Sequence, residues 1–262
     1  MAREVIDDRF IGALHLLALT RAGLDHDVEL ERTAIQTGTI NALLNGCYEG
    51  DITIEELLRH GSDGIGTIQH LDGELIVVRG IAYTARADGS VEVVEPKIKT
   101  PFAVLTRFNA SEFLRVTAQG FGEFCEKLDD LSPQETVMAI RARGTFKNLH
   151  LRSVAKQYPP FKPLCEVVAD QTEWHFEEAN GDIVGFRFPD TTAGIEVPGW
   201  HLHFVSGDRR HGGHIISLDV VDAEVDWNNS NELHVELPAN IEIGGLADAD
   251  RNAIDMVEAR SH

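Results

Sequence analysis

Three histidines in the second half of the sequence have the spacing of a metal site. His201 and His203 are separated by one residue, so on a β-strand their side chains would project from the same face about 7 Å apart. The following segment, residues 204–213, contains Asp208 and two adjacent glycines, as a hairpin loop does. His214 would then lie on the returning strand. Three neutral imidazoles with an open fourth position are typical of a catalytic zinc ion.

His211 is a competing third ligand, because strand alternation alone does not decide between it and His214. We favour His214, since His211 precedes the glycine pair, where the loop is expected. Histidine pairs with this spacing also arise by accident. Separate core or surface histidines are therefore the alternative interpretation.

Two charged residues could act beside such a metal ion. A single strand through residues 144–153 would place four side chains on one face: Phe146, Asn148, His150 and Arg152. A guanidinium can bind a substrate carboxylate through two parallel hydrogen bonds. Glu74 opens an otherwise apolar strand directly after an Asp-Gly turn. Taken alone, Arg152 and Glu74 are each explained more simply as solvent-exposed charges.

The charge balance excludes one class of partner. The chain of 262 residues has 43 acidic and 23 basic side chains, a formal net charge of −20. Binding to nucleic acid or to an anionic membrane needs a basic face that neutralises phosphates, so neither partner is expected. Gly64 and Gly66 lack the lysine of a P-loop and the third glycine of a dinucleotide motif. A small anionic substrate would need a local cation, either an arginine or a metal ion.

The cysteines and the N-terminal region indicate a cytoplasmic protein. The three cysteines are odd in number and far apart in the sequence, which is typical of a reducing compartment rather than of a disulfide framework. The apolar run at residues 10–19 is shorter than the roughly 20 residues of a spanning helix. It also lacks the basic flank of a signal peptide.

The expected elements alternate between β-rich and helical stretches. Thr53 and Glu56 have the spacing of a capping box. Helices are expected at residues 53–61, 111–118, 121–129, 132–144 and 248–259. Strands are expected at residues 74–79, 81–86, 91–94 and 100–108, and most of the chain from 144 to 237 is expected to be β-structure.

This order predicts an α+β protein with two subdomains, in which mixed or antiparallel β-sheets are flanked by helices and the metal site lies in the C-terminal half. We expect a variable lead-in at residues 1–33, an N-terminal α/β subdomain at 34–142, and a β-rich zinc-binding subdomain at 143–262.

Several short motifs, in this order and spacing, resemble the α-acetolactate decarboxylase family. The motifs are TINALLNGCYEGD (39–51), GIGT (64–67), LDGEL (71–75), TPFAV (100–104), GTF (144–146), RSV (152–154), GFR (185–187), VPGWHLHF (197–204) and GGH (212–214). Each motif alone is weak, but the ordered set is specific. The resemblance covers about residues 35–222. His211 is a departure from the family pattern.

The resemblance implies a site, position by position. The zinc ligands of the family fall on His201, His203 and His214, and its active-site glutamate falls on Glu74. The catalytic arginine falls on Arg152. Two further positions are less firmly aligned: the substrate-pocket threonine is Thr67, and the second catalytic glutamate, from the C-terminal tail, is Glu258.

The same resemblance implies a zinc-dependent lyase of acetoin biosynthesis, a carboxy-lyase that converts (S)-2-acetolactate to (R)-acetoin and CO₂ and forms a homodimer. In that mechanism zinc chelates the hydroxyl and carbonyl oxygens, and a glutamate protonates the enediolate. Which of the two glutamates donates the proton is left open. The alternatives are a three-histidine, cupin-like oxygenase acting on a small acid, and a non-catalytic metal-binding domain.

Overall fold

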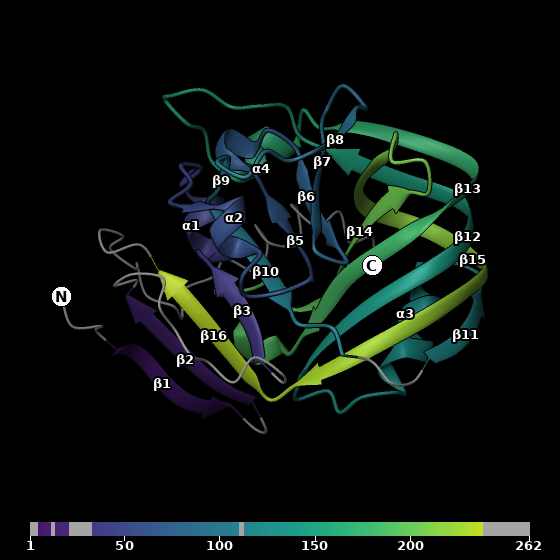
Figure 1. Ribbon diagram of the computed structural model, residues 1–262, viewed down its shortest axis with the longest axis horizontal. Coiled ribbons are helices and arrows are strands. Elements are labelled where there is room, and N and C mark those ends of the chain that lie inside the picture. Colours follow the sequence, from purple (N-terminus) through teal and green to yellow (C-terminus); the bar gives the residue numbers. More distant parts are fainter. Residues whose placement is uncertain (1–4, 12–13, 21–32, 110–112, 238–262) are drawn as a thin grey trace.

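The architecture consists of two large β-sheets packed against each other, with short helices at their margins (Figure 1). The computed structural model describes residues 5–11, 14–20, 33–109 and 113–237. None of the helices in these parts of the chain has the length and hydropathy that a membrane crossing requires.

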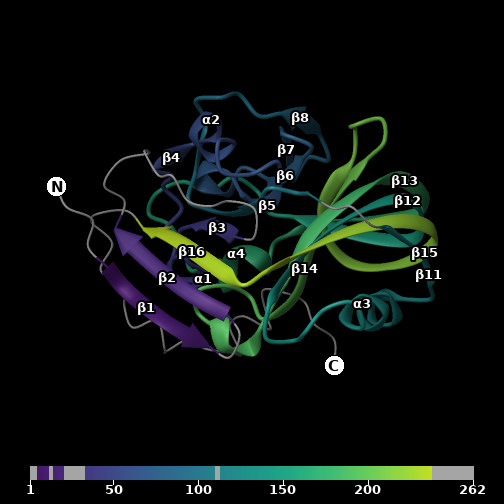
Figure 2. The same cartoon turned by 60° about the horizontal axis from the view of Figure 1, so that its bottom comes forward.

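The first sheet has nine strands and is mixed. Their order is β1 (Val5–Ile11), β2 (Leu14–Thr20), β16 (Glu232–Leu237), β3 (Thr33–Thr37), β10 (Phe102–Thr106), β5 (Asp63–Thr67), β6 (Glu74–Val78), β7 (Ile81–Ala85) and β8 (Val91–Val93). Strand β16 runs parallel to β2 and β3, between which it lies (Figure 2). The described C-terminal strand therefore belongs to the sheet that the N-terminal half of the chain builds.

The second sheet is antiparallel. Its order is β11 (Phe113–Ala118), β15 (Gly212–Ser230), β12 (Val137–Ser153), β13 (Thr172–Phe188) and β14 (Gly199–Ser206). Strand β14 also pairs with β15, so four of the strands close into a ring. This closure brings β14 and the start of β15 together, which are the strands that carry the three histidines.

Four α-helices, two short 3₁₀-helices (Gln69–Leu71 and Asp190–Thr192) and a small two-stranded sheet complete the described structure. The helices are α1 (Ile40–Leu44), α2 (Ile54–Leu57), α3 (Phe121–Asp129) and α4 (Leu164–Val168), and the small sheet pairs β4 (Ile52–Thr53) with β9 (Lys99–Thr100). Helix α2 begins with the expected capping box, in which Thr53 and Glu56 satisfy each other's backbone N–H groups.

Apolar side chains of the two sheets form a common core. Ile76 and Val104 of the first sheet pack in one cluster with Phe186 and Val205 of the second. The opposite face of the first sheet buries Leu75 against α2. Strands with both faces covered are apolar along their whole length, and this is why β6 and β10 read as continuous apolar runs.

The expected α+β class with mixed and antiparallel sheets is confirmed, and so are the strands between residues 74 and 106 and helix α3. The helix expected at 111–118 is wrong: Phe113–Ala118 forms strand β11, which pairs with β15. Val116 and Ala118 are both buried, and burial of every second residue is the pattern of a β-strand with one covered face. Tertiary pairing therefore outweighs local helix propensity there.

The helix expected from Ser132 is also wrong. Pro133 accepts a turn hydrogen bond from the backbone N–H of Thr136, and strand β12 begins at Val137. Residues 138–140 are buried and pair with strands on both sides, β13 and β15, which satisfies their backbone groups as strand rather than helix. The helix expected at 248–259 lies outside the described residues, and the division of the chain after residue 142 stays a prediction.

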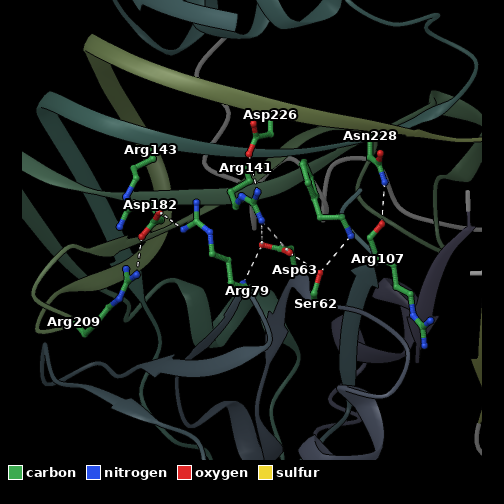
Figure 3. Close-up of polar contacts among 11 residues, drawn as sticks. Ser62, Asp63, Arg79, Arg107, Arg141, Arg143, Asp182, Arg209, Asp226 and Asn228 are labelled. Atoms are coloured by element: carbon green, nitrogen blue, oxygen red, sulfur yellow. Dashed lines mark hydrogen bonds and ion pairs between the residues drawn. The ribbon is translucent and has the colours of Figure 1, made fainter. Parts of the chain in front are cut away.

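A network of arginines and aspartates joins the two sheets (Figure 3). Asp63 on β5, only 1% exposed, accepts a hydrogen bond from Arg141 on β12 at 3.3 Å. Arg141 also donates to Asp226 on β15 at 2.7 Å. A second buried carboxylate, Asp182, is surrounded by three guanidinium groups, of which that of Arg209 is nearest at 2.7 Å. These guanidinium groups offset the desolvation cost of burying the two carboxylates, which would be strongly unfavourable without them.

Replacing Asp63 by alanine is expected to lower the free energy of unfolding by about 3 kcal/mol, because it leaves Arg141 partly desolvated with Asp226 as its remaining partner. Denaturant unfolding measures this change. Arg115→Ala is the matched control, since the Arg115–Asp222 pair is exposed and such pairs contribute less than about 1 kcal/mol. Equal effects of the two substitutions would contradict the interpretation.

Candidate active site

The three histidines converge where strand β14 meets strand β15. His201 and His203 lie on β14 and point to the same side, as the spacing predicts. His214 lies on β15 directly opposite His203. The ring centroids are 4.9–5.5 Å apart, and one nitrogen of each ring lies within 4.8 Å of the others. The histidines are 8%, 0% and 3% exposed, in sequence order.

His211 does not join this group. It is exposed, lies in the turn that follows Ser206, and packs against Phe176 with ring centroids 5.2 Å apart. Its backbone carbonyl accepts the hydrogen bond that closes the turn. The sequence-based preference for His214 over His211 therefore agrees with the arrangement of the rings.

A backbone carbonyl sets the tautomer of His203. Its Nδ1 donates to the carbonyl oxygen of Leu75 on β6 at 2.9 Å, because a carbonyl can only accept. The lone pair of this ring therefore lies on Nε2. Metal-binding histidines commonly have such a second partner, which orients the ring. No sequence signal pointed to Leu75, because the contribution comes from its main chain.

Glu74 and Thr67 lie beside the histidines. Glu74 begins β6 directly after Gly73, whose φ of 116° suits glycine. Its carboxylate Oε2 is 3.6 Å from Nε2 of His203. Thr67 on β5 pairs with Glu74 and its hydroxyl donates to the carbonyl of Gly73 at 2.9 Å. Thr67 thus supports the turn that places the Glu74 carboxylate.

Arg152 approaches from strand β12, where it is the direct partner of His214 on β15. It is 4% exposed, and its Nη1 donates to the side-chain oxygen of Gln171 at 3.1 Å. Sequence reasoning missed Gln171, which lies just before β13 and acquires its importance only from strand pairing.

The four side chains expected on one face of β12 do not all lie there, because the alternation of faces is interrupted before His150. Asn148 has a φ of 46° and is skipped in the pairing with β13, so it forms a bulge. Phe146 consequently points into the same core as Leu149 and Leu151. His150 and Arg152 point to the other face, without Phe146.

The reactive groups share a pocket with an apolar wall. Five of the expected site residues line it: Thr67, Glu74, Arg152, His201 and His214. Helices α1 and α4 contribute the apolar side chains of Ile40, Leu43, Leu164 and Val168 to the lining. Glu258 lies outside the described residues. Apolar surroundings strengthen electrostatic interactions between the polar groups and a bound molecule.

The donor set fits a divalent metal ion. Three imidazoles are a ligand set of zinc and of other borderline cations, and they leave coordination positions for a substrate. The three ring nitrogens converge in a buried position, and the tautomer of His203 suits ligation through Nε2. The structure therefore contains a three-histidine group that can hold a metal ion.

Comparisons with known proteins agree on one family. The family model for alpha-acetolactate decarboxylase matches residues 35–244. The alpha-acetolactate decarboxylase of Methylococcus capsulatus is 37% identical over 248 residues, which are 94% of either chain. That of Klebsiella aerogenes is 38% identical over 207 residues, 78% of this chain and 80% of the other. The crystal structure of the Bacillus subtilis strain 168 enzyme gives a TM-score of 0.82 at 32% identity, covering 86% of this chain and 99% of that one.

The pocket brings buried imidazoles together with a carboxylate and a guanidinium, and the comparisons identify the class of the protein as the carboxy-lyases. Within that class, the chain belongs to the α-acetolactate decarboxylase family.

Proposed function

We propose that this protein decarboxylates (S)-2-acetolactate to (R)-acetoin and carbon dioxide, with a zinc ion held by His201, His203 and His214. The observation that carries the proposal is that the three imidazoles converge and that two of them, those of His201 and His214, line one pocket with Glu74 and Arg152. Family membership supports the substrate, since relatives over most of the chain carry this activity in their name.

The chemistry explains why these residue types are needed. Loss of CO₂ from a β-keto acid leaves the electron pair of the broken carbon–carbon bond in an enediolate, so negative charge develops on the adjacent oxygens. A zinc ion, when bound, supplies a Lewis acid that stabilises this charge. The β-carbonyl is already an electron sink, and no organic cofactor is required.

Arg152 binds and orients the substrate in this proposal. Its buried guanidinium carries a fixed positive charge in a protein whose net charge is −20, and it can hold a carboxylate through two hydrogen bonds. Gln171 keeps the guanidinium in place. The apolar wall from α1 and α4 suits the methyl groups of acetolactate and excludes water.

A glutamate completes the reaction by delivering a proton to carbon. In this proposal the donor is Glu74 in its protonated form, which is supported by its position in the pocket lining, 3.6 Å from Nε2 of His203. Glu258 is the second candidate from the sequence resemblance. Delivery from one face only would give the product a single configuration.

The proposal is tested by incubating the purified protein with acetolactate and measuring acetoin and CO₂, with and without a chelator. We expect turnover that the chelator abolishes and zinc restores. Turnover in metal-free protein would contradict the zinc mechanism, and no turnover in metal-loaded protein would contradict the assigned substrate.

Arg152→Lys is expected to lower kcat/KM by about 10–100-fold, mainly through a higher KM. Lysine keeps the charge but loses the planar pair of donors, and a charge-assisted hydrogen bond contributes about 1.5–3 kcal/mol. Steady-state kinetics measures the change. Arg143→Lys, also on β12 but outside the pocket, is the control and should behave as the unchanged protein. An Arg152→Lys protein with normal KM would exclude this role.

We further propose that the protein acts in the cytoplasm as a homodimer. All three cysteines are free thiols, as a reducing compartment favours, and the dimer follows from the sequence resemblance. Light scattering that gives the mass of one 28.9 kDa chain would contradict the dimer.

A further inference from the structure

A second group of metal-binding side chains lies on the strands next to Arg152. His150 on β12 and His175 on β13 are direct cross-strand partners, and their rings stack with centroids 3.8 Å apart. Glu173, on the same strand as His175, places its carboxylate Oε2 at 2.8 Å from Nε2 of His150. One nitrogen or oxygen of each side chain lies within 4.8 Å of the others.

This spacing fits one small divalent cation. Zinc bonds to nitrogen and oxygen are about 2.0–2.2 Å long, so two ligands of a tetrahedral site lie roughly 3.3 Å apart. The 2.8 Å contact between His150 and Glu173 would open slightly and the wider distances would close. To point both lone pairs at one ion, the rings of His150 and His175 would have to rotate out of their stacked arrangement, and the exposure of Glu173 and His175 and the partial exposure of His150 leave room for that rotation.

Glu173 is already held as a metal-binding carboxylate usually is. Its Oε1 accepts a hydrogen bond from Nε2 of Gln171 at 2.7 Å, while Oε2 faces His150. The hydrogen bond from Gln171, followed by that from His150, lowers the pKa of Glu173. Outer partners of this kind orient ligands and tune metal affinity.

The group differs from the other contacts between histidine and carboxylate on this protein. Pairs such as His70–Glu49 and His15–Asp8 contain one imidazole each and offer two ligands at most. Only the groups at His150 and at the three buried histidines combine three ligands within the described residues. Two imidazoles and one carboxylate are a known zinc ligand set.

We propose that His150, Glu173 and His175 form a second site for a borderline divalent cation such as Zn²⁺, separate from the three-histidine site. Gln171 links the two regions, because it donates to Glu173 and accepts from Arg152 at 3.1 Å. The proposal concerns metal binding alone and does not depend on the decarboxylase activity.

The test is the number of metal ions bound by the full-length protein. Apoprotein is dialysed against Zn²⁺ and, separately, titrated with Co²⁺, and bound metal is counted by elemental analysis and by cobalt absorption. We expect two equivalents per chain, and one in the double variant His150→Ala, His175→Ala. His203→Ala should still bind the metal ion at His150. This result distinguishes the second site from the proposed catalytic site, whose metal ion the substitution removes. His211→Ala, which removes an exposed histidine outside both groups, should keep two.

A milder substitution guards against misfolding of the double variant. Gln171→Ala should weaken the second equivalent by about 10–100-fold, as expected for loss of an outer partner. A single equivalent in the unchanged protein that is lost in His203→Ala and kept in the double variant would overturn the proposal. So would a second equivalent that survives in the double variant, or one with the strong near-ultraviolet absorption of cobalt bound to cysteine.

Discussion

Replacing His203 by alanine is expected to abolish the tightly bound metal ion of the pocket and to lower acetolactate decarboxylation by about 10³-fold or more. A Lewis-acid metal stabilises the developing charge by several kcal/mol, and each 1.36 kcal/mol corresponds to a factor of ten in rate. His203 is central to the group, since its Nδ1 is fixed by Leu75 and it lies opposite His214. Kinetics and metal analysis on the same samples measure the effect.

The matched control for this prediction is His211→Ala. His211 is close in sequence but exposed and outside the three-histidine group, so its removal should change neither the activity nor the metal of the pocket. Unfolding curves should show that both variants are folded. A His203→Ala protein with full activity would exclude the three-histidine site as the catalytic centre.

The second large effect is expected for Glu74→Gln, which should lower kcat by about 10²–10⁴-fold, the range of a lost general acid. Glutamine keeps the shape of the side chain but cannot donate the carboxyl proton. KM should change less, because in the proposed mechanism Arg152 and the metal ion hold the substrate. The configuration of the acetoin, measured by chiral chromatography, should also become mixed if the proton then arrives from solvent.

Two measurements make the Glu74 prediction specific. Metal content must stay unchanged, because the Glu74 carboxylate is only 3.6 Å from Nε2 of His203 and a loss of metal would imitate a loss of acid. Glu92→Gln on β8, an exposed carboxylate of the same sheet, should keep full activity. A metal-loaded Glu74→Gln protein with normal kcat would assign the proton to Glu258 instead.

The three histidines show what local sequence can establish. Their placement depends on strand alternation and on a short hairpin, both of which involve residues within 14 positions of one another. The same holds for the capping box at Thr53 and for the strands after glycine turns. For Glu74 and Arg152 the local pattern favoured ordinary surface charges, and for Thr67 it indicated no role; only the family resemblance indicated a shared site.

Other features were decided by tertiary structure. Residues 113–118 become a strand because β15 offers a partner about 100 positions later. The bulge at Asn148 places Phe146 and Arg152 on opposite faces of β12, although regular alternation would place them on the same face. The carbonyl of Leu75 reaches His203 across 128 positions. The second histidine group likewise exists only through the register of β12 and β13.

By itself, therefore, the sequence determined the residue types, the periodicity of individual strands and a net charge of −20. Only the tertiary structure decided which of these residues meet. The reason is physical: backbone geometry over a few residues specifies the direction of a side chain, whereas the neighbours of that side chain depend on strand register and on the burial of apolar faces between segments far apart in the chain.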